Sequence, residues 1–265
     1  MYRKYIITIW RLITLVLILL PNQGRSLYAR QKDNTTSGKM EVPIYDEAQY
    51  KQHVVHKSFE LVYNENTRLP EWVAYELTLE EVEGVTPRGN GFVQDPAIKG
   101  IQADNEDYRN SGWDRGHMAP AGDMKIDKQS MLESFYFSNI CPQNRNLNGG
   151  DWKSLEELVR DYARKYTRVY VVCGPIVGNN NYGRLGPHQI VIPDAFFKVL
   201  LLETKNGYES IGFIMNNEAG HKKLSSYAKT IDEIENITGL DFFHLIPDKI
   251  EEEIEANYNL SVWGL

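Results

Sequence analysis

A short stretch near the middle of the chain, "GWDRGHMAPAGDM", concentrates side chains that could carry out chemistry. Asp114, Arg115 and His117 lie within four residues, and Gly116 between them would let the backbone approach a ligand closely. A neutral imidazole has a pKa of about 6.5 and can accept a proton from water, while an arginine fork suits phosphate oxygens. Two interpretations follow: a charged turn between strands, or a site where histidine takes a proton beside an anion held by arginine.

A second stretch, "NICPQNRNLNGGDWKSLEELVR", offers a metal ligand and an ion pair. The amide oxygen of Asn148 is a hard neutral ligand that suits Mg²⁺, although the residue taken alone is better explained as part of a loop before a helix that Asp151 can cap. Glu156 and Arg160 are neighbours on that helix, at the margin of its apolar stripe. They could reach a cleft beside the sheet, or form a surface ion pair worth less than about 1 kcal/mol.

Two other groups of potential ligands carry less weight. His53 and His56 in "HVVH" could bind a metal three residues apart, but they precede the expected core, so a structural role explains them better. Cys141 and Cys173 both lie in apolar runs. The sequence leaves open whether they form a disulfide or remain buried thiols.

The elements that must position these residues are strands and helices without a regular alternation. Residues 151–166 carry apolar side chains at helical spacing and predict a long amphipathic helix. Residues 230–240 predict a shorter helix that ends at Gly239. Strands are expected at residues 57–64, 71–84, 168–178, 195–204 and 208–217. This pattern predicts an α+β fold with a mixed, largely antiparallel sheet and helices packed on it.

The first residues of the chain resemble a targeting segment. Basic residues precede an apolar block that breaks at Pro21, which is typical of a secretory signal peptide over residues 1–29. Arg11 interrupts the block, so an uncleaved membrane anchor is the weaker alternative. Residues 30–50 are polar and predict a flexible lead-in, and residues 51–265 form the expected catalytic domain. The protein is therefore expected to be secreted or periplasmic, without a stable membrane partner after signal cleavage.

The charge of the chain argues against nucleic-acid binding through a global field. The 265 residues include 29 basic and 36 acidic side chains. Removal of residues 1–29 would take away four basic groups and no acid, which leaves 25 basic against 36 acidic groups and a net charge of −11. Any binding to a polyanion must therefore come from a local cluster of arginines.

The ordered combination of motifs resembles the family of DNA/RNA non-specific endonucleases. "DRGHMAP" is followed by "FSNICPQNRNLNGGDWKSLEELVR", and "NTRLPEWVAYELT", "TPRGNGFVQD", "GPIVG", "VIPDAFFKV" and "TGLDFF" are similar to the same family. The similarity spans roughly residues 56–245. A D-R-G-H match alone would be weak, but the ordered set is specific.

The resemblance implies a ββα-metal (His-Me) finger and cleavage of phosphodiesters with one Mg²⁺-like ion, or Mn²⁺ in its place. His117 matches the general base of the family. Asn148 matches its single protein metal ligand, and Glu156 matches the acid that organises metal-bound water. Asp114 is the first acid of the motif and is expected to support the site. The arginines that match phosphate contacts are Arg88, Arg115 and Arg160.

The expected function is that of an exported, metal-dependent endonuclease that cuts DNA and RNA with little sequence or sugar specificity and leaves 5′-phosphate ends. One alternative is a phosphodiesterase acting on small nucleotides with the same residues. A second is a catalytically silent nucleic-acid-binding protein, against which the complete set of site residues argues. The sequence leaves open whether two copies pair as a homodimer.

Overall fold

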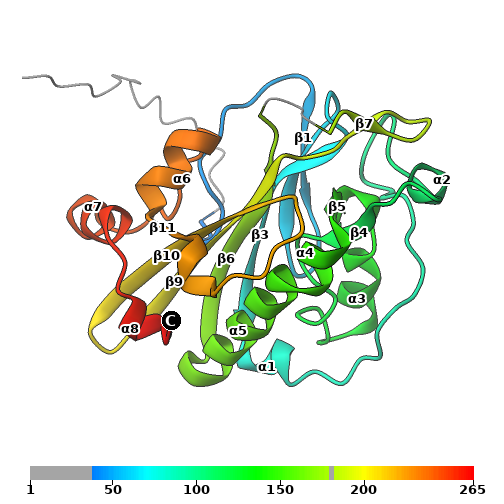
Figure 1. Ribbon diagram of the computed structural model, residues 1–265. Coiled ribbons are helices and arrows are strands. Elements are labelled where there is room, and N and C mark those ends of the chain that lie inside the picture. The colour runs from blue at the N-terminus through cyan, green and yellow to red at the C-terminus, as the bar shows by residue number, and fades with distance from the viewer. Residues whose placement is uncertain (1–37, 179–181) are drawn as a thin grey trace, which may run out of the picture. The chain divides into compact units, whose positions relative to one another are not determined.

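The computed structural model describes residues 38–178 and 182–265, so the predicted signal at residues 1–29 lies outside the described part. Residues Thr36–Leu265 belong to one compact unit. Its largest sheet among the described residues has the strand order β1-β2-β3-β6-β9-β10-β11, and every pair of neighbours is antiparallel (Figure 1). Its strands are β1 Lys51–Val55, β2 Glu60–Asn64, β3 Leu69–Thr78, β6 Arg168–Ile176, β9 Ala195–Thr204, β10 Gly207–Asn216 and β11 Ala228–Lys229.

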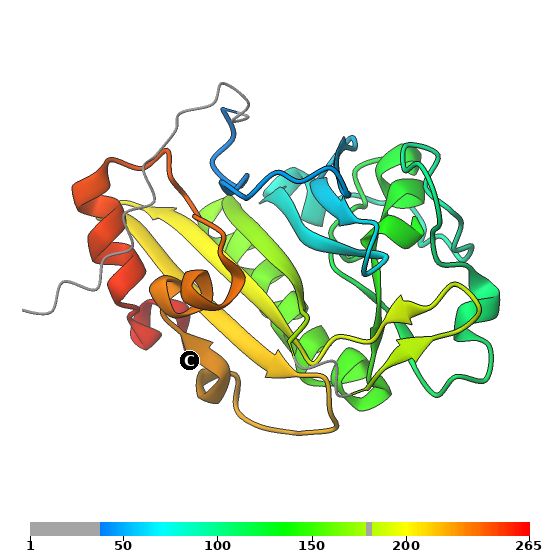
Figure 2. The same cartoon turned by 90° about the horizontal axis from the view of Figure 1, so that it is seen from above.

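Alternating apolar residues allow the central strands to bury both faces of the sheet, because successive side chains point to opposite sides. In β9, Phe196, Leu200 and Leu202 pack into one apolar cluster. Phe197 and Val199 pack into a second. The first cluster lies under helix α5, Asp151–Tyr166, and the second under helix α6, Ile231–Thr238. Figure 2 shows helices on both sides of the sheet.

Helix α5 forms where the apolar stripe predicted it. Leu155, Val159 and Tyr162 are buried on its inner side. The predicted cap is wrong, because Gly150 occupies the cap position and Asp151 is the first helical residue. The Asp151 carboxylate instead accepts hydrogen bonds from the hydroxyl of Tyr227 at 2.6 Å and the backbone N–H of Lys222 at 3.2 Å.

The strand predicted at residues 71–84 ends earlier than expected. The structure has strand only to Thr78, after which helix α1, Leu79–Val82, begins. The Thr78 side chain accepts from the backbone N–H of Glu81, and the Glu81 side chain accepts from the backbone of Thr78. This capping box stabilises a helical turn that the alternating apolar pattern did not reveal.

Smaller elements complete the unit. A hairpin of β4, Asp114–His117, and β5, Ile140–Gln143, is followed directly by helix α4, Arg145–Gly149, and then α5. The remaining elements are α2 Asn105–Tyr108, α3 Lys128–Ser134, η1 Phe137–Asn139, β7 Arg184–Leu185, β8 Ile190–Val191, η2 Leu224–Tyr227, α7 Asp248–Ala256 and α8 Leu260–Trp263.

The segment predicted as a flexible lead-in is packed from about its middle. Val42 is buried, and Ile44 exchanges backbone hydrogen bonds with Asp241 at 2.8 and 3.0 Å. The folded part therefore begins before residue 51. In the described part of the chain, no helix combines the length and apolar character that a membrane crossing requires.

Both cysteines lie in the interior. Cys141 on β5 and Cys173 on β6 are buried free thiols, and burial raises the pKa of each. The alternative that the sequence left open is thus resolved in favour of buried thiols.

Candidate active site

The β4–β5 hairpin holds the histidine of the first motif. His117 ends β4 opposite Ile140. The segment after it is fixed by Asn139, whose side-chain oxygen accepts from the Ala119 N–H at 2.8 Å and whose amide donates to the Ala119 carbonyl at 2.9 Å. Trp152 of α5 donates from its indole nitrogen to the His117 carbonyl at 3.4 Å. The backbone of His117 is therefore held by both the hairpin and the long helix.

The His117 imidazole sits in an aromatic pocket and is kept neutral. Its ring centroid lies 5.4 Å from that of Phe92 and 5.0 Å from that of Phe135. The side chain is 8% exposed, and its Nε2 has no hydrogen-bond partner among the described residues. Burial, with a smaller effect of the Arg88 charge, lowers the pKa of His117 to about 3. The neutral ring presents an unpartnered nitrogen as an acceptor, while burial makes it a weaker base than a histidine in water.

Two arginines converge on the same aromatic rings. The Arg115 guanidinium lies 4.8 Å from the Phe92 ring, and Asn105 accepts from it at 2.8 Å. The Arg88 guanidinium lies 5.3 Å from the Phe135 ring. Since His117 contacts both rings, the two arginines lie on either ring of the pocket around the imidazole.

Gly116 has a different purpose from the one expected. A Cβ at this position would lie 2.2 Å from Oε1 of Gln143 and 2.7 Å from its Cβ. The absence of a side chain therefore makes room for Gln143, the cross-strand neighbour of Asp114, rather than for a ligand. Gln143 is fully buried, which could not be predicted from the sequence "CPQ".

Asp114 and Asn148 form the link between the hairpin and helix α4. Nδ2 of Asn148 donates to Oδ2 of Asp114 at 3.2 Å, and Arg145 donates to Oδ1 of Asp114 at 3.3 Å. A carboxylate only accepts hydrogen bonds, so the Asn148 amide must turn its NH₂ group toward Asp114. Its carbonyl oxygen then points away from Asp114 and is free to act as a ligand.

Arg160 is held by an acid that the sequence analysis passed over. Its guanidinium donates to Oδ1 of Asp123 at 2.8 Å, and Asp123 is fully buried and also accepts from the Tyr75 hydroxyl at 3.0 Å. A Cβ on Gly122 would lie 3.0 Å from the guanidinium, so this glycine leaves space for it. Among the described residues the ion pair of Arg160 is with Asp123, and the surface pair with Glu156, one of the two alternatives that the sequence left open, is not formed.

Glu156 lies beside a buried lysine. Burial raises the pKa of Glu156 to about 8, and the charge of Lys198 is the largest influence that lowers it. Lys198 is fully buried on β9, with its Nζ 4.6 Å from the centroid of Trp152. The position of this lysine inside the apolar run "AFFKVLLLET" could have indicated that its side chain is buried. Lys198 thus provides positive charge beneath the helix that carries Glu156.

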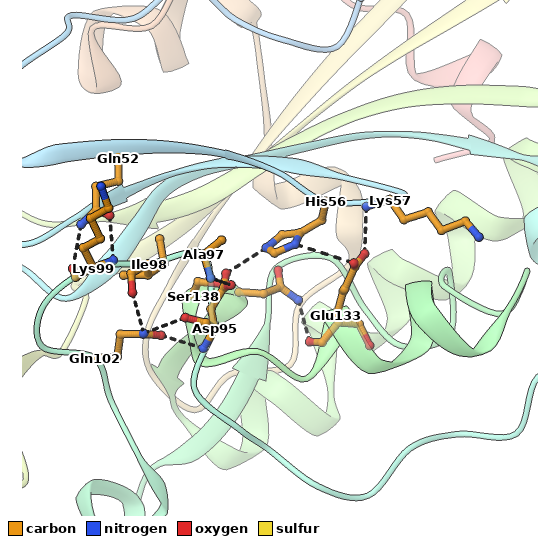
Figure 3. Close-up of polar contacts among 12 residues, drawn as sticks. Gln52, His56, Lys57, Asp95, Ala97, Ile98, Lys99, Gln102, Glu133 and Ser138 are labelled. Carbon is orange, nitrogen blue, oxygen red and sulfur yellow. Dashed lines mark hydrogen bonds and ion pairs between the residues drawn. The ribbon is translucent and has the colours of Figure 1, made fainter.

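A polar network around His56 joins segments that lie far apart in the sequence (Figure 3). His56 Nε2 lies 2.9 Å from Oδ2 of Asp95, and the Ser138 hydroxyl donates to the same oxygen at 2.6 Å. Glu133 accepts from the backbone N–H of Lys57 at 2.8 Å. These contacts tie the turn between β1 and β2 to α3 and to the loop after Phe92. His56 is therefore structural, in agreement with the interpretation preferred from the sequence.

A second acidic group beside the site could hold a metal by spacing alone. Asp104, Asp107 and His188 bring ligand atoms within 4.8 Å of one another. Asp107 accepts from the His188 backbone at 2.8 Å, lies 2.9 Å from its Nδ1, and accepts from the Asp104 N–H at 2.8 Å. These bonds fasten α2 to the β7–β8 hairpin. Since α2 carries Asn105, the group also supports Arg115.

The donors around Asn148 fit a hydrated hard cation. Mg²⁺ prefers oxygen ligands and keeps several waters, so one amide oxygen can suffice where a substrate phosphate supplies others. The orientation imposed by Asp114 presents that oxygen, and the carboxyl group of Glu156 keeps an oxygen able to accept from a water in either protonation state. Asn148 and Glu156 are therefore the residues that would hold the metal, directly and through water.

A hairpin that carries a histidine, followed by a helix that carries an asparagine, defines the ββα-metal class of nuclease fold. The comparisons agree, because residues 36–249 match the family described as DNA/RNA non-specific endonuclease. The chain belongs to this family.

Individual relatives are similar over most of the folded part. Mitochondrial nuclease EXOG of Xenopus laevis is 34% identical over 73% of this chain, which spans 58% of the relative. Mitochondrial endonuclease G of Homo sapiens is 34% identical over 70% of this chain and 67% of its own. A crystal structure of an EndoG/EndoGI complex matches with a TM-score of 0.69 and 30% identity, over 74% of this chain and 87% of that one.

The comparisons overturn the predicted location. The similar proteins from Xenopus laevis, Homo sapiens and Saccharomyces cerevisiae are all named as mitochondrial nucleases, so the expectation of a secreted or periplasmic protein is wrong. A basic start followed by an apolar block is not unique to secretory signals, which is why the composition misled.

Proposed function

We propose that this protein is a metal-dependent endonuclease that hydrolyses phosphodiester bonds in DNA and RNA with little sequence or sugar specificity. The observation that carries the proposal is the buried, neutral His117 imidazole, whose Nε2 is unpartnered among the described residues. Arg115 shares the Phe92 ring with it, and Asn148 lies near the end of helix α4, which follows the hairpin. Membership of the family supports the same activity.

Each side chain has a defined task in this proposal. His117 takes a proton from the attacking water, which is general base catalysis. Arg88, Arg115 and Arg160 bind phosphate oxygens and offset their growing charge. The metal, when bound, stabilises the leaving 3′-oxygen, so the products carry 5′-phosphate ends. Glu156 orients water at the site.

A plasmid-nicking assay tests this proposal. The purified protein should convert supercoiled plasmid to open-circle and linear forms with Mg²⁺ or Mn²⁺, and EDTA should abolish the conversion. A single-stranded RNA of mixed sequence should also be degraded. His117→Ala is the control against a contaminating nuclease.

The same preparation distinguishes the alternatives. A small bis-aryl phosphate should be cleaved far more slowly than long DNA. Preference for the small substrate would replace the proposal with a nucleotide phosphodiesterase, and DNA binding without cleavage would indicate a silent binding protein. Pairing of two copies stays a prediction, which a mass measurement in solution would check.

A further inference from the structure

Helices α6 and α7 bring acidic side chains together on the side of the sheet opposite α5. Asp232 and Glu235 lie on α6 and Glu255 lies on α7. One carboxylate oxygen from each falls within 4.8 Å of the others. Asp232 is exposed, Glu235 is partly buried, and Glu255 is 8% exposed. The cluster is therefore open to solvent at one end and buried at the other.

The buried end of the cluster holds a carboxylate oxygen that lacks a hydrogen-bond partner. Glu235 Oε1 accepts from the backbone N–H of Phe242 at 2.8 Å. Oε1 of Glu255 is buried and has no hydrogen-bond partner among the described residues. An acceptor of this kind is costly unless a donor or a cation meets it.

Burial and the neighbouring acidic side chains disfavour the ionised forms of Glu255 and Glu235. Burial and the nearby carboxylates raise the pKa of Glu255 to about 9, and burial with Asp241 and Asp232 raises that of Glu235 to about 8. The largest influences on both groups contain no positive side chain. Because no positive side chain offsets these carboxyl groups, either protons or a bound cation must neutralise them.

We propose that Asp232, Glu235 and Glu255 bind a calcium ion that joins α7 to α6. The ligand set contains only carboxylate oxygens, which favours a hard cation over zinc. Calcium bonds of about 2.3–2.6 Å span ligand atoms up to about 5 Å apart, whereas magnesium bonds of about 2.1 Å span only about 4 Å. The three ligand atoms lie within 4.8 Å of one another, which calcium bonds can span. A set of three protein carboxylates also suits calcium better than magnesium, which usually binds one or two carboxylates and keeps several waters. Waters complete the shell at the exposed end beside Asp232.

Thermal unfolding of the full chain tests this site apart from catalysis. Protein stripped with EDTA and dialysed should gain about 3–6 °C in Tm at a calcium concentration tenfold above Kd. The Kd is expected near about 0.1–1 mM. Asn148→Ala should keep the full shift, because that residue belongs to the proposed catalytic site.

Variants of the cluster give the decisive comparison. Glu255→Gln should lose the calcium shift, while its metal-free Tm should not fall, because the amide keeps the size of the side chain and brings no charge into the buried site. Glu253→Gln, which alters an exposed glutamate of the same helix, should keep the shift. Asp232→Asn serves as a second variant at an exposed position, and should weaken calcium binding at least tenfold. An unchanged Tm of the parent protein in about 10 mM calcium, or an intact shift in both cluster variants, would overturn the proposal.

Discussion

Among single residues, His117 gives the sharpest test of mechanism. His117→Ala removes the proposed base but leaves the arginines and Asn148, so the cleavage rate should fall by about 10²–10⁴-fold while DNA affinity stays nearly intact. Imidazole added to the buffer should restore part of the activity by entering the space between Phe92 and Phe135. Single-turnover cleavage and DNA binding in EDTA provide the two measurements. Cleavage at the parent rate by a folded variant would refute the proposed mechanism.

Asn148 and Arg160 should fail in different ways. Asn148→Ala removes the direct ligand, so half-maximal activity should need more Mg²⁺, and high metal should recover part of the rate. Arg160→Ala should raise KM and lower kcat/KM at an unchanged metal requirement, because its partner Asp123 belongs to the protein scaffold. Titrations of both variants over metal and substrate separate the two effects. Identical metal requirements in both variants would contradict the assignment of Asn148 as a ligand.

The sequence analysis identified site residues that belong to a sequence motif. It missed the residues that contact and position them. His117 and Arg115 stand out because their side-chain chemistry is unusual in a short stretch, whereas Asn148 was identified only through the resemblance to the nuclease family. Asp123 and Lys198 act only through other residues, and their partners come from distant parts of the chain. No local pattern reveals such contacts.

Among helices and strands, those with a clear local sequence pattern were predicted, and those that depend on particular side-chain contacts were not. The long helix at residues 151–166 has enough turns for its apolar stripe to be read directly. Helix α1 has four residues and depends on a capping box between Thr78 and Glu81. A strand pattern runs into it without a break, so the boundary could not be placed from periodicity.

The hydrogen bonds between His56, Ser138 and Asp95 should make the stability of the fold sensitive to acid. Burial alone would raise the pKa of Asp95, but hydrogen bonds from His56 and Ser138 hold it below its usual value. A carboxylate with a lowered pKa stabilises the fold above its unfolded pKa of about 3.9, and this contribution is lost as the pH falls through the folded pKa.

Asp95→Asn should therefore reduce the free energy of unfolding at pH 7 by about 1–3 kcal/mol. The variant should also lose less stability than the parent protein as the pH falls below about 4. Urea unfolding at several pH values measures both effects. Asp248→Asn, at an exposed acid, is the matched control. Equal acid sensitivity in the parent protein and Asp95→Asn would show that Asp95 is not responsible.

The whole chain carries a net charge of −7, so binding to a polyanion such as DNA must depend on a few local arginines. Three arginines at phosphates would release about three counterions, so the logarithm of the DNA association constant should fall with a slope of about −2.7 against the logarithm of salt concentration. Arg115→Gln should reduce this slope by about 1. Binding of inactive His117→Ala protein to a duplex provides the measurement. A flat salt response would favour the small-nucleotide alternative.

The alternation of side chains along β9 also limits how the chain can change in length. Lys198 faces Trp152 beneath α5, while Phe197 and Val199 on either side of it face the α6 layer. Deletion of one residue within this strand would turn the lysine toward α6 and place an apolar side chain beneath Glu156. Both layers would be disrupted at once, since β9 pairs with β6 and β10 along its length. Insertions and deletions among relatives are therefore expected in the connecting loops and excluded from this strand.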